Sequence, residues 1–164
     1  MKRLMMTVLL AASATSVAQL ALDPLPAVLA DVTRSPQVVW YAPQLTRADV
    51  AETLRRAMVE QGVQVYLITT EADMYRPGSL AFHLALAGAT TYLVPPGTSA
   101  PFLLSAQLGA EGPGVALPGP STPVTPARLA QLRRWAANVT RRAPVPLPLL
   151  VHTWLQRVRH LTTH

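Results

Sequence analysis

The sequence predicts a mixed α/β domain with a mostly parallel sheet and crossover helices. Three short apolar runs, at residues 37–42, 63–68 and 90–94, are rich in β-branched and aromatic residues and are typical of buried strands. Segments with helical periodicity separate these runs, and strand–helix–strand alternation favours parallel pairing. The chain has 164 residues, which is enough for one modest domain.

The first helix is expected between residues 46 and 62. Thr46 is a suitable N-cap, and apolar residues such as Val50 and Leu54 recur at helical spacing after it. Gly62 is a natural stop, because glycine adopts the left-handed conformation that often ends a helix. The second strand, 63–68, follows directly.

The middle of the chain continues the same alternation. A polar stretch with Gly and Pro covers residues 69–78, Ser79 caps a short helix that ends at Gly88, and the strand 90–94 is closed by Pro95-Pro96-Gly97. Two further short strands are expected at 102–106 and 115–117. The sheet is therefore predicted to be mixed rather than wholly parallel.

The C-terminal third is predicted to be helical. Thr125-Pro126 opens a helix with an N-cap and a proline at the first helical position. Alternating prolines at 143–148 favour an extended connector. A basic amphipathic helix follows at 149–161, with Val151, Trp154, Leu155 and Val158 on one side.

The N-terminus is typical of a secretory signal over residues 1–18. Lys2 and Arg3 precede an apolar stretch at 4–12, and Ser16-Val17-Ala18 offers small residues for cleavage. The sequence therefore predicts an exported protein, whether periplasmic, cell-envelope or secreted. An uncleaved N-terminal anchor is the alternative, and it places the domain outside the cytoplasm as well.

The charged residues are distributed unevenly. All eight acids lie between Asp23 and Glu111, whereas the chain from Gly112 onward carries seven arginines and no acid. This asymmetry suggests an anionic partner, such as nucleic acid or a lipid surface, and the alternative is a solvated arginine face. The absence of cysteine excludes disulfides, thiolate metal sites and a cysteine nucleophile.

Residues 31–143 resemble one half of the phospholipase D-like family. The resemblance begins with VVWYAPQLTRADVAETLRRAMVEQGVQVYLIT and continues with LAFHLALAGATTYLV. TSAPFLLSA then stands where the family places its H-x-K-x4-D strand, and TPARLAQLRRWAANV is similar to the closing helix. The order and spacing of these segments carry the resemblance, which implies a phospholipase D-like half-domain followed by a separate C-terminal segment, 144–164.

The resemblance also implies a catalytic histidine, lysine and aspartate, and these are missing. The three motif positions fall at Ser99, Pro101 and Ala106, and the only lysine in the chain is Lys2. A serine without a base is a poor nucleophile, and proline and alanine carry no charge. The expected protein is therefore a noncatalytic half, and the family pattern implies a homodimer or a catalytic partner half.

Two groups of residues remain as candidate sites. Arginines beside Trp135 suit phosphate groups, and the expected anion-binding residues are Arg133, Arg134, Arg141 and Arg142. A second candidate is a cleft after the strand 63–68, at the strand end where α/β sheets often bind ligands, formed by Glu71, Asp73, Arg76 and His83. His83 itself is expected to be partly buried in a helix.

No metal site and no cofactor are expected. His152 and His160 stand eight residues apart, which is too far for a pair of ligands on adjacent helical turns. Three hypotheses remain: a noncatalytic protein that binds a phosphate-bearing ligand or a partner subunit, a hydrolase or phosphodiesterase with a non-standard site at Glu71, Asp73 and His83, and a membrane-surface protein docked by its C-terminal helix.

Overall fold

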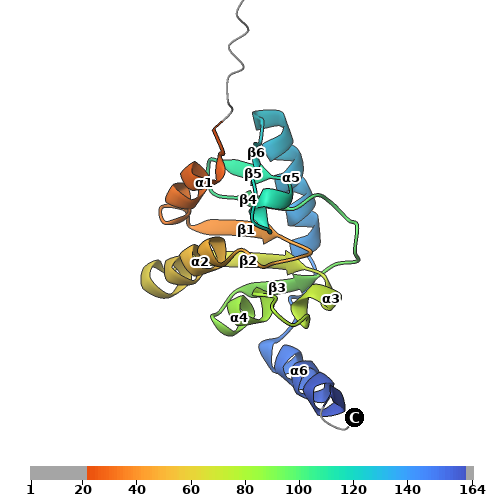
Figure 1. Ribbon diagram of the computed structural model, residues 1–164. Coiled ribbons are helices and arrows are strands. Elements are labelled where there is room, and N and C mark those ends of the chain that lie inside the picture. The colour runs from red at the N-terminus through yellow and green to blue at the C-terminus, as the bar shows by residue number, and fades with distance from the viewer. Residues whose placement is uncertain (1–21, 162–164) are drawn as a thin grey trace, which may run out of the picture.

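A single six-stranded sheet organises the computed structural model, which describes residues 22–161 (Figure 1). The strand order is β3-β2-β1-β4-β5-β6. The strands are β1 (Gln37–Tyr41), β2 (Gln64–Thr69), β3 (Thr90–Leu93), β4 (Phe102–Leu104), β5 (Gly109–Glu111) and β6 (Thr122–Pro123). Strands β1, β2 and β3 are parallel, and the other three pair antiparallel. The mixed α/β architecture predicted from the sequence is confirmed, but the sheet is parallel only at its β3-β2-β1 end and is not mostly parallel as expected, because three of its five strand pairings are antiparallel.

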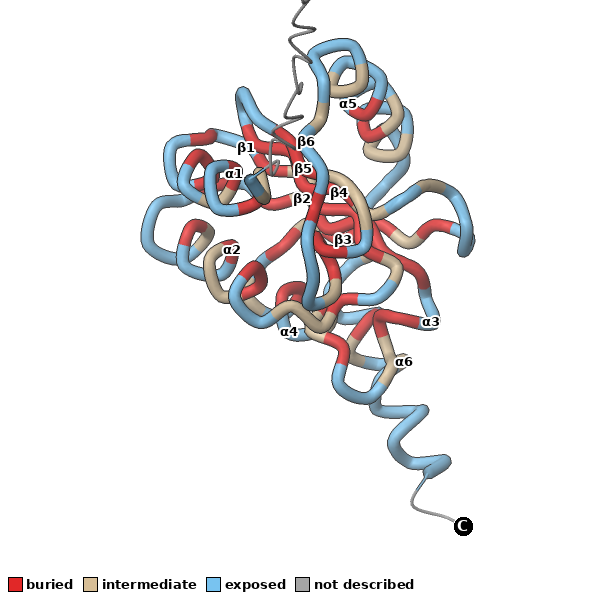
Figure 2. Tube along the Cα trace, turned by 45° about the horizontal axis from the view of Figure 1, so that its top comes forward, coloured by how far each residue is buried: buried red, intermediate tan, exposed pale blue. Residues whose placement is uncertain are grey.

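Helices cover both faces of the sheet. α1 (Leu25–Val32), α2 (Ala48–Gln61) and α4 (Ala81–Leu86) pack on one face, and α5 (Pro126–Thr140) crosses the other (Figure 1). Alternate residues of β1 serve the two layers: Trp40 belongs to the core under α1, α2 and α4, while Tyr41 packs with α5. Figure 2 shows the buried segments concentrated between these layers.

The helix ends follow local signals in the sequence. Gly62 ends α2 with a φ of 69°, in the left-handed region. Thr125 caps α5 by accepting a hydrogen bond from the Arg128 backbone N–H, and Pro126 occupies the first turn. Both expectations are confirmed.

Thr46 does not cap α2, contrary to expectation. The helix begins at Ala48, and Arg47 is its N-cap residue. The backbone N–H groups of Thr46 and Arg47 both donate to the carbonyl of Ala116, so this segment is held by a distant loop rather than by its own helix. The helix α1 was also not expected, because the prolines at 24 and 26 made this segment look like an irregular lead into the domain. The structure accommodates Pro26 in the first turn of α1, where no backbone N–H is needed.

The expected strand at 115–117 is wrong. Residues Pro113–Val115 form a short 3-10 helix, η1, and the fifth strand is β5. A Cβ at Gly109 would lie 2.9 Å from Leu104 Cδ2 and 3.2 Å from Val124 Cβ. Glycine in this strand therefore permits close packing.

The last helix, α6 (Leu147–Leu161), begins two residues earlier than expected. Pro148 fits because the first turn of a helix needs no N–H donor. The connector before it is fixed at the β3 edge, where the Val145 N–H donates to Thr91 O at 2.8 Å.

A further short helix, α3 (Glu71–Met74), lies within the polar stretch after β2. No helix within residues 22–161 is long and apolar enough to span a membrane. The signal expected at 1–18 lies outside the described residues.

Candidate functional site

The strand that the resemblance assigns to catalysis places its three motif positions apart. Ser99 and Pro101 precede β4, and Ala106 follows it. Because β4 runs antiparallel to β1, the first two lie at the edge of the sheet where β1 ends, and Ala106 lies where β1 begins. Three residues of strand span about 10 Å. These positions therefore do not form one site.

Polar groups at the end of β4 have a structural role. The buried Ser105 hydroxyl donates to Asp31 Oδ2 at 2.6 Å, and the Ala106 N–H donates to Ser35 Oγ at 2.9 Å. Asp31 lies on α1 and Ser35 follows it. This network connects the first helix to the centre of the sheet, and it engages the hydroxyl of Ser105, the residue before the motif position Ala106.

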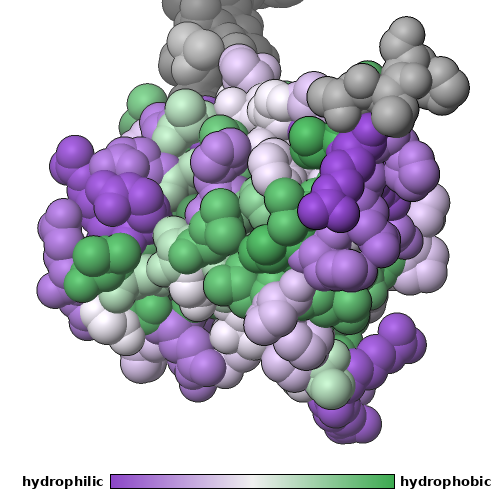
Figure 3. All heavy atoms as spheres, turned by 90° about the horizontal axis from the view of Figure 1, so that it is seen from below, coloured by the Kyte–Doolittle hydropathy of each residue, from purple (hydrophilic) through white to green (hydrophobic). Residues whose placement is uncertain are grey.

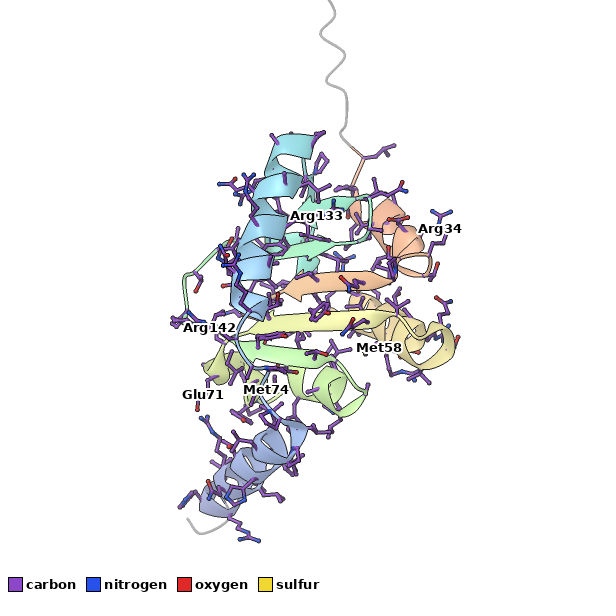
Figure 4. All side chains as sticks on the ribbon, turned by 180° about the vertical axis from the view of Figure 1, so that it is seen from behind. Arg34, Met58, Glu71, Met74, Arg133 and Arg142 are labelled. Atoms are coloured by element: carbon purple, nitrogen blue, oxygen red, sulfur yellow. The ribbon has the colours of Figure 1, made fainter. Side chains whose placement is uncertain are left out.

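The four candidate arginines of the α5 region differ in their contacts. The Arg133 guanidinium donates to the carbonyls of Ser105 and Ala106, at 3.3 Å for Ser105. The side chains of Arg134, Arg141 and Arg142 are exposed and have no hydrogen-bond or ion-pair partner within residues 22–161. Arg141 is the C-cap of α5, so Arg142 lies past the helix (Figure 4). We call these three residues the α5 arginines.

Most other arginines in the described part of the chain are paired with a carboxylate. Seven of them place a guanidinium nitrogen 2.7 to 3.7 Å from an acid oxygen, and these are Arg34, Arg47, Arg55, Arg56, Arg76, Arg128 and Arg157. The chain from Gly112 onward carries no acid, and the α5 arginines are exposed. Guanidinium groups of this kind are able to bind phosphate.

An open cleft lies beside α5. It has a volume of about 370 Å³ and is lined by Gln37, Tyr66, Ser105, Arg133 and Thr140 among others. Trp135, by contrast, packs inward against Tyr41 and Phe102, with ring centroids 5.2 and 5.5 Å away. Trp135 is therefore partly buried, with its ring engaged by the core aromatic side chains.

Asp73, from the second candidate site, is a buried structural carboxylate. Its side chain is about 1% exposed. It accepts hydrogen bonds from the Leu45 N–H at 3.1 Å, from Thr69 Oγ1 at 3.3 Å and from Arg76 at 2.7 Å. These contacts fix the turn after β2 to the loop after β1 and leave the carboxylate little capacity for acid–base work.

The other members of that candidate site separate into different cavities. Glu71 pairs with Arg157 at 2.8 Å, and both line a cavity of about 580 Å³ at the carboxyl ends of β2 and β3. Arg76 and His83 line another, between α4 and α6. His83 is exposed, not partly buried as expected, because it lies on the outer side of α4. The structure brings Asp73 to Arg76 but does not assemble all four residues.

The groove between α4 and α6 was not expected from the sequence. It measures about 590 Å³, and Phe82 stacks on Trp154 across it with ring centroids 5.5 Å apart and an interplanar angle of 15°. Arg157 lies over the Tyr75 ring at 4.5 Å from its centroid. The helical period of α6 predicted one apolar side, but only the fold shows that Val151, Trp154 and Val158 of this side line the groove against α4 while Leu155 stays outside it.

Comparison with known proteins supplies no family for this fold, since no family model and no curated protein matches the chain. Within residues 22–161, no group of three or more His, Asp or Glu side chains is placed to hold a metal ion.

Proposed function

We propose that the protein is a noncatalytic binding module for a phosphate-bearing polyanion, with nucleic acid as the ligand class that we test first. The observation that carries the proposal is the contrast between the α5 arginines, which have no side-chain partner among the described residues, and the seven arginines paired with acids. Exposed guanidinium groups without neighbouring carboxylates bind phosphates and release condensed counterions.

This mode of binding is independent of base sequence. Phosphate contacts position a protein on nucleic acid but do not read bases. Trp135, the aromatic side chain nearest to the α5 arginines in sequence, packs into the core and does not stack on a base. Binding is therefore expected to be sensitive to salt and tolerant of sequence.

We also propose that the domain is a phospholipase D-like half that has lost its catalytic motif. Support comes from the order β1, α2, β2, α4, β3, β4 and α5, which is the order in which the resembling segments follow one another. The motif positions hold Ser99, Pro101 and Ala106, which provide no nucleophile with a base, no cation and no carboxylate. A partner half, or a second copy of this chain, is part of the same proposal.

The test is binding of residues 19–164 to labelled single- and double-stranded DNA across a salt series, with the same samples run on a gel to detect cleavage. The variant R134Q/R141Q/R142Q removes three unpaired charges. The control R34Q/R55Q/R56Q removes three charges that are exposed but paired with acids. We expect the first variant to lower the slope of log affinity against log salt by roughly two to three units and the control to lower it much less.

Three results would contradict the proposal. Absence of binding at low salt, or an equal loss in both variants, would remove the α5 arginines as the site. Cleavage that persists through stringent purification would remove the noncatalytic assignment and favour the alternative of a hydrolase with a non-standard site.

A further inference from the structure

The helix α6 leaves an apolar surface open to solvent. Of its residues only Leu150 is buried, and the helix projects from the body beyond β3 (Figure 2). Its exposed apolar side chains are large: Leu161 is 77% exposed, Leu155 42%, Trp154 38% and Val158 36%. Leu86 on α4, 50% exposed, continues this surface across the groove. Figure 3, viewed from below, shows a broad apolar area with hydrophilic side chains around it.

These side chains form one face by virtue of their spacing. Positions 154, 155, 158 and 161 repeat every three to four residues and fall on one side of an α-helix. A helix of 15 residues is about 22 Å long, so this face is extended rather than a single contact. Exposed apolar areas of this kind in soluble domains mark interaction sites.

The charged side chains of α6 itself have one sign, although one of them, Arg157, is paired with Glu71 of α3 at 2.8 Å. α6 contains Arg157, Arg159, His152 and His160 and no acid. Arg157 and Arg159 are two residues apart, so they point about 200° apart around the helix, one on each border of the apolar face. An apolar face bordered by cations is the pattern of a helix that lies in the interface of an anionic membrane.

We propose that α6 docks the protein on the surface of an anionic lipid bilayer, with Trp154, Leu155, Val158 and Leu161 in the interface. A peptide bound in the groove between α4 and α6 would leave Leu155 in water, because Leu155 does not line that groove. A bilayer interface covers Leu155 and Leu161 together. Acidic headgroups match the basic borders of the helix, whereas an uncharged partner does not. This surface is separate from the α5 arginines, and the inference does not depend on the proposed function.

The test uses the full chain with two kinds of vesicle, pure phosphatidylcholine and a phosphatidylcholine–phosphatidylglycerol mixture, in a cosedimentation assay. The variant L155S/L161S removes two exposed leucines from α6. The matched control V59S/L108S removes two exposed aliphatic side chains, 63% and 42% exposed, that lie outside α6. Near-ultraviolet circular dichroism checks that both variants retain the native fold.

We expect strong partition to the anionic vesicles only. L155S/L161S is expected to weaken it by roughly tenfold or more and the control to leave it unchanged. R159Q is expected to weaken it by about fivefold. DNA binding by L155S/L161S is expected to be normal, which separates this result from the test of the α5 arginines.

Three outcomes would overturn the inference. These are no partition to anionic vesicles at low salt, equal partition of wild type and L155S/L161S, or partition that does not depend on anionic lipid. Self-association that L155S/L161S abolishes, without vesicle binding, would show that a second copy covers the face instead and would also overturn it.

Discussion

At the scale of single residues, Asp73 connects two loops that are far apart in the sequence. Its buried carboxylate accepts hydrogen bonds from Leu45, Thr69 and Arg76. Removing it in D73A leaves the Leu45 N–H and the Arg76 guanidinium without their acceptor. We expect the free energy of unfolding, measured with urea, to fall by about 3–5 kcal/mol.

Glu71 offers the matched control for Asp73. It is exposed and its pair with Arg157 lies in solvent, so E71Q is expected to change stability by less than about 1 kcal/mol. A small effect of D73A, similar to that of E71Q, would contradict the structural role of Asp73 and return it to consideration as a reactive group.

Tyr41 presents the opposite situation, a buried hydroxyl without a hydrogen-bond partner in the described part of the chain. Its ring packs against Phe102 at 5.7 Å and Trp135 at 5.2 Å. Y41F keeps this packing and removes a desolvated polar group, so we expect the midpoint of thermal unfolding to stay the same or rise. Y41A is expected to cost about 3 kcal/mol or more. A clear loss of stability in Y41F would reveal a partner for the hydroxyl.

At the scale of elements, α2 contains the carboxylate with the largest change in pKa. Glu52 accepts hydrogen bonds from Arg55 and Arg56, and these contacts lower the pKa of Glu52 from 4.5 to about 2. Because the folded-state pKa is below the unfolded value, the stabilisation is complete above pH 4.5 and is lost as the pH falls toward 2.

We therefore expect E52Q to differ most from wild type near neutral pH and to converge with it in acid. Thermal unfolding from pH 7 to pH 2 measures the convergence, and a carboxyl NMR titration of Glu52 measures the pKa directly. Asp49, whose pKa is lowered by its hydrogen bonds from Arg47, remains in both proteins and sets a common background. A titration midpoint of Glu52 near 4.5 would refute the role of the two arginines.

At the scale of the whole molecule, the sequence predicted what depends on local chemistry. The end of α2 at Gly62 and the N-cap of α5 at Thr125-Pro126 depend only on residues next to them in the sequence. The structure contains both. The strand β5 was not predicted because it begins with a glycine, Gly109. The reason for this glycine is close packing on Leu104 and Val124, and the local sequence does not reveal such a contact. The sequence marked four arginines in this region as candidates, but which of them have a partner depends on the fold, and Arg133 alone donates to backbone carbonyls, those of Ser105 and Ala106.

The candidate acidic cleft illustrates the same limit. Glu71, Asp73 and Arg76 are close in sequence at the end of β2, where ligand sites are common. In the folded protein, Asp73 accepts a hydrogen bond from the Leu45 N–H, 28 positions away in the chain. Glu71 accepts one from Arg157, which is 86 positions away. Residues that are close in the chain therefore have different environments, Asp73 in the buried network and Glu71 at an open cavity, and only the three-dimensional structure separates them.

The relation of α6 to the rest of the molecule gives the last prediction. The helix contributes one buried side chain, Leu150, and the stack of Trp154 on Phe82 to the body. Ending the chain at residue 146 keeps the Val145 contact with β3 and is expected to cost about 2–4 kcal/mol, from one buried leucine and one aromatic pair. The truncated protein should still unfold cooperatively in urea and still bind DNA through the α5 arginines, because these lie before the truncation. Loss of cooperative unfolding would show that α6 is part of the folding unit, and its exposed face would then have to be explained together with the core rather than as an appended docking helix.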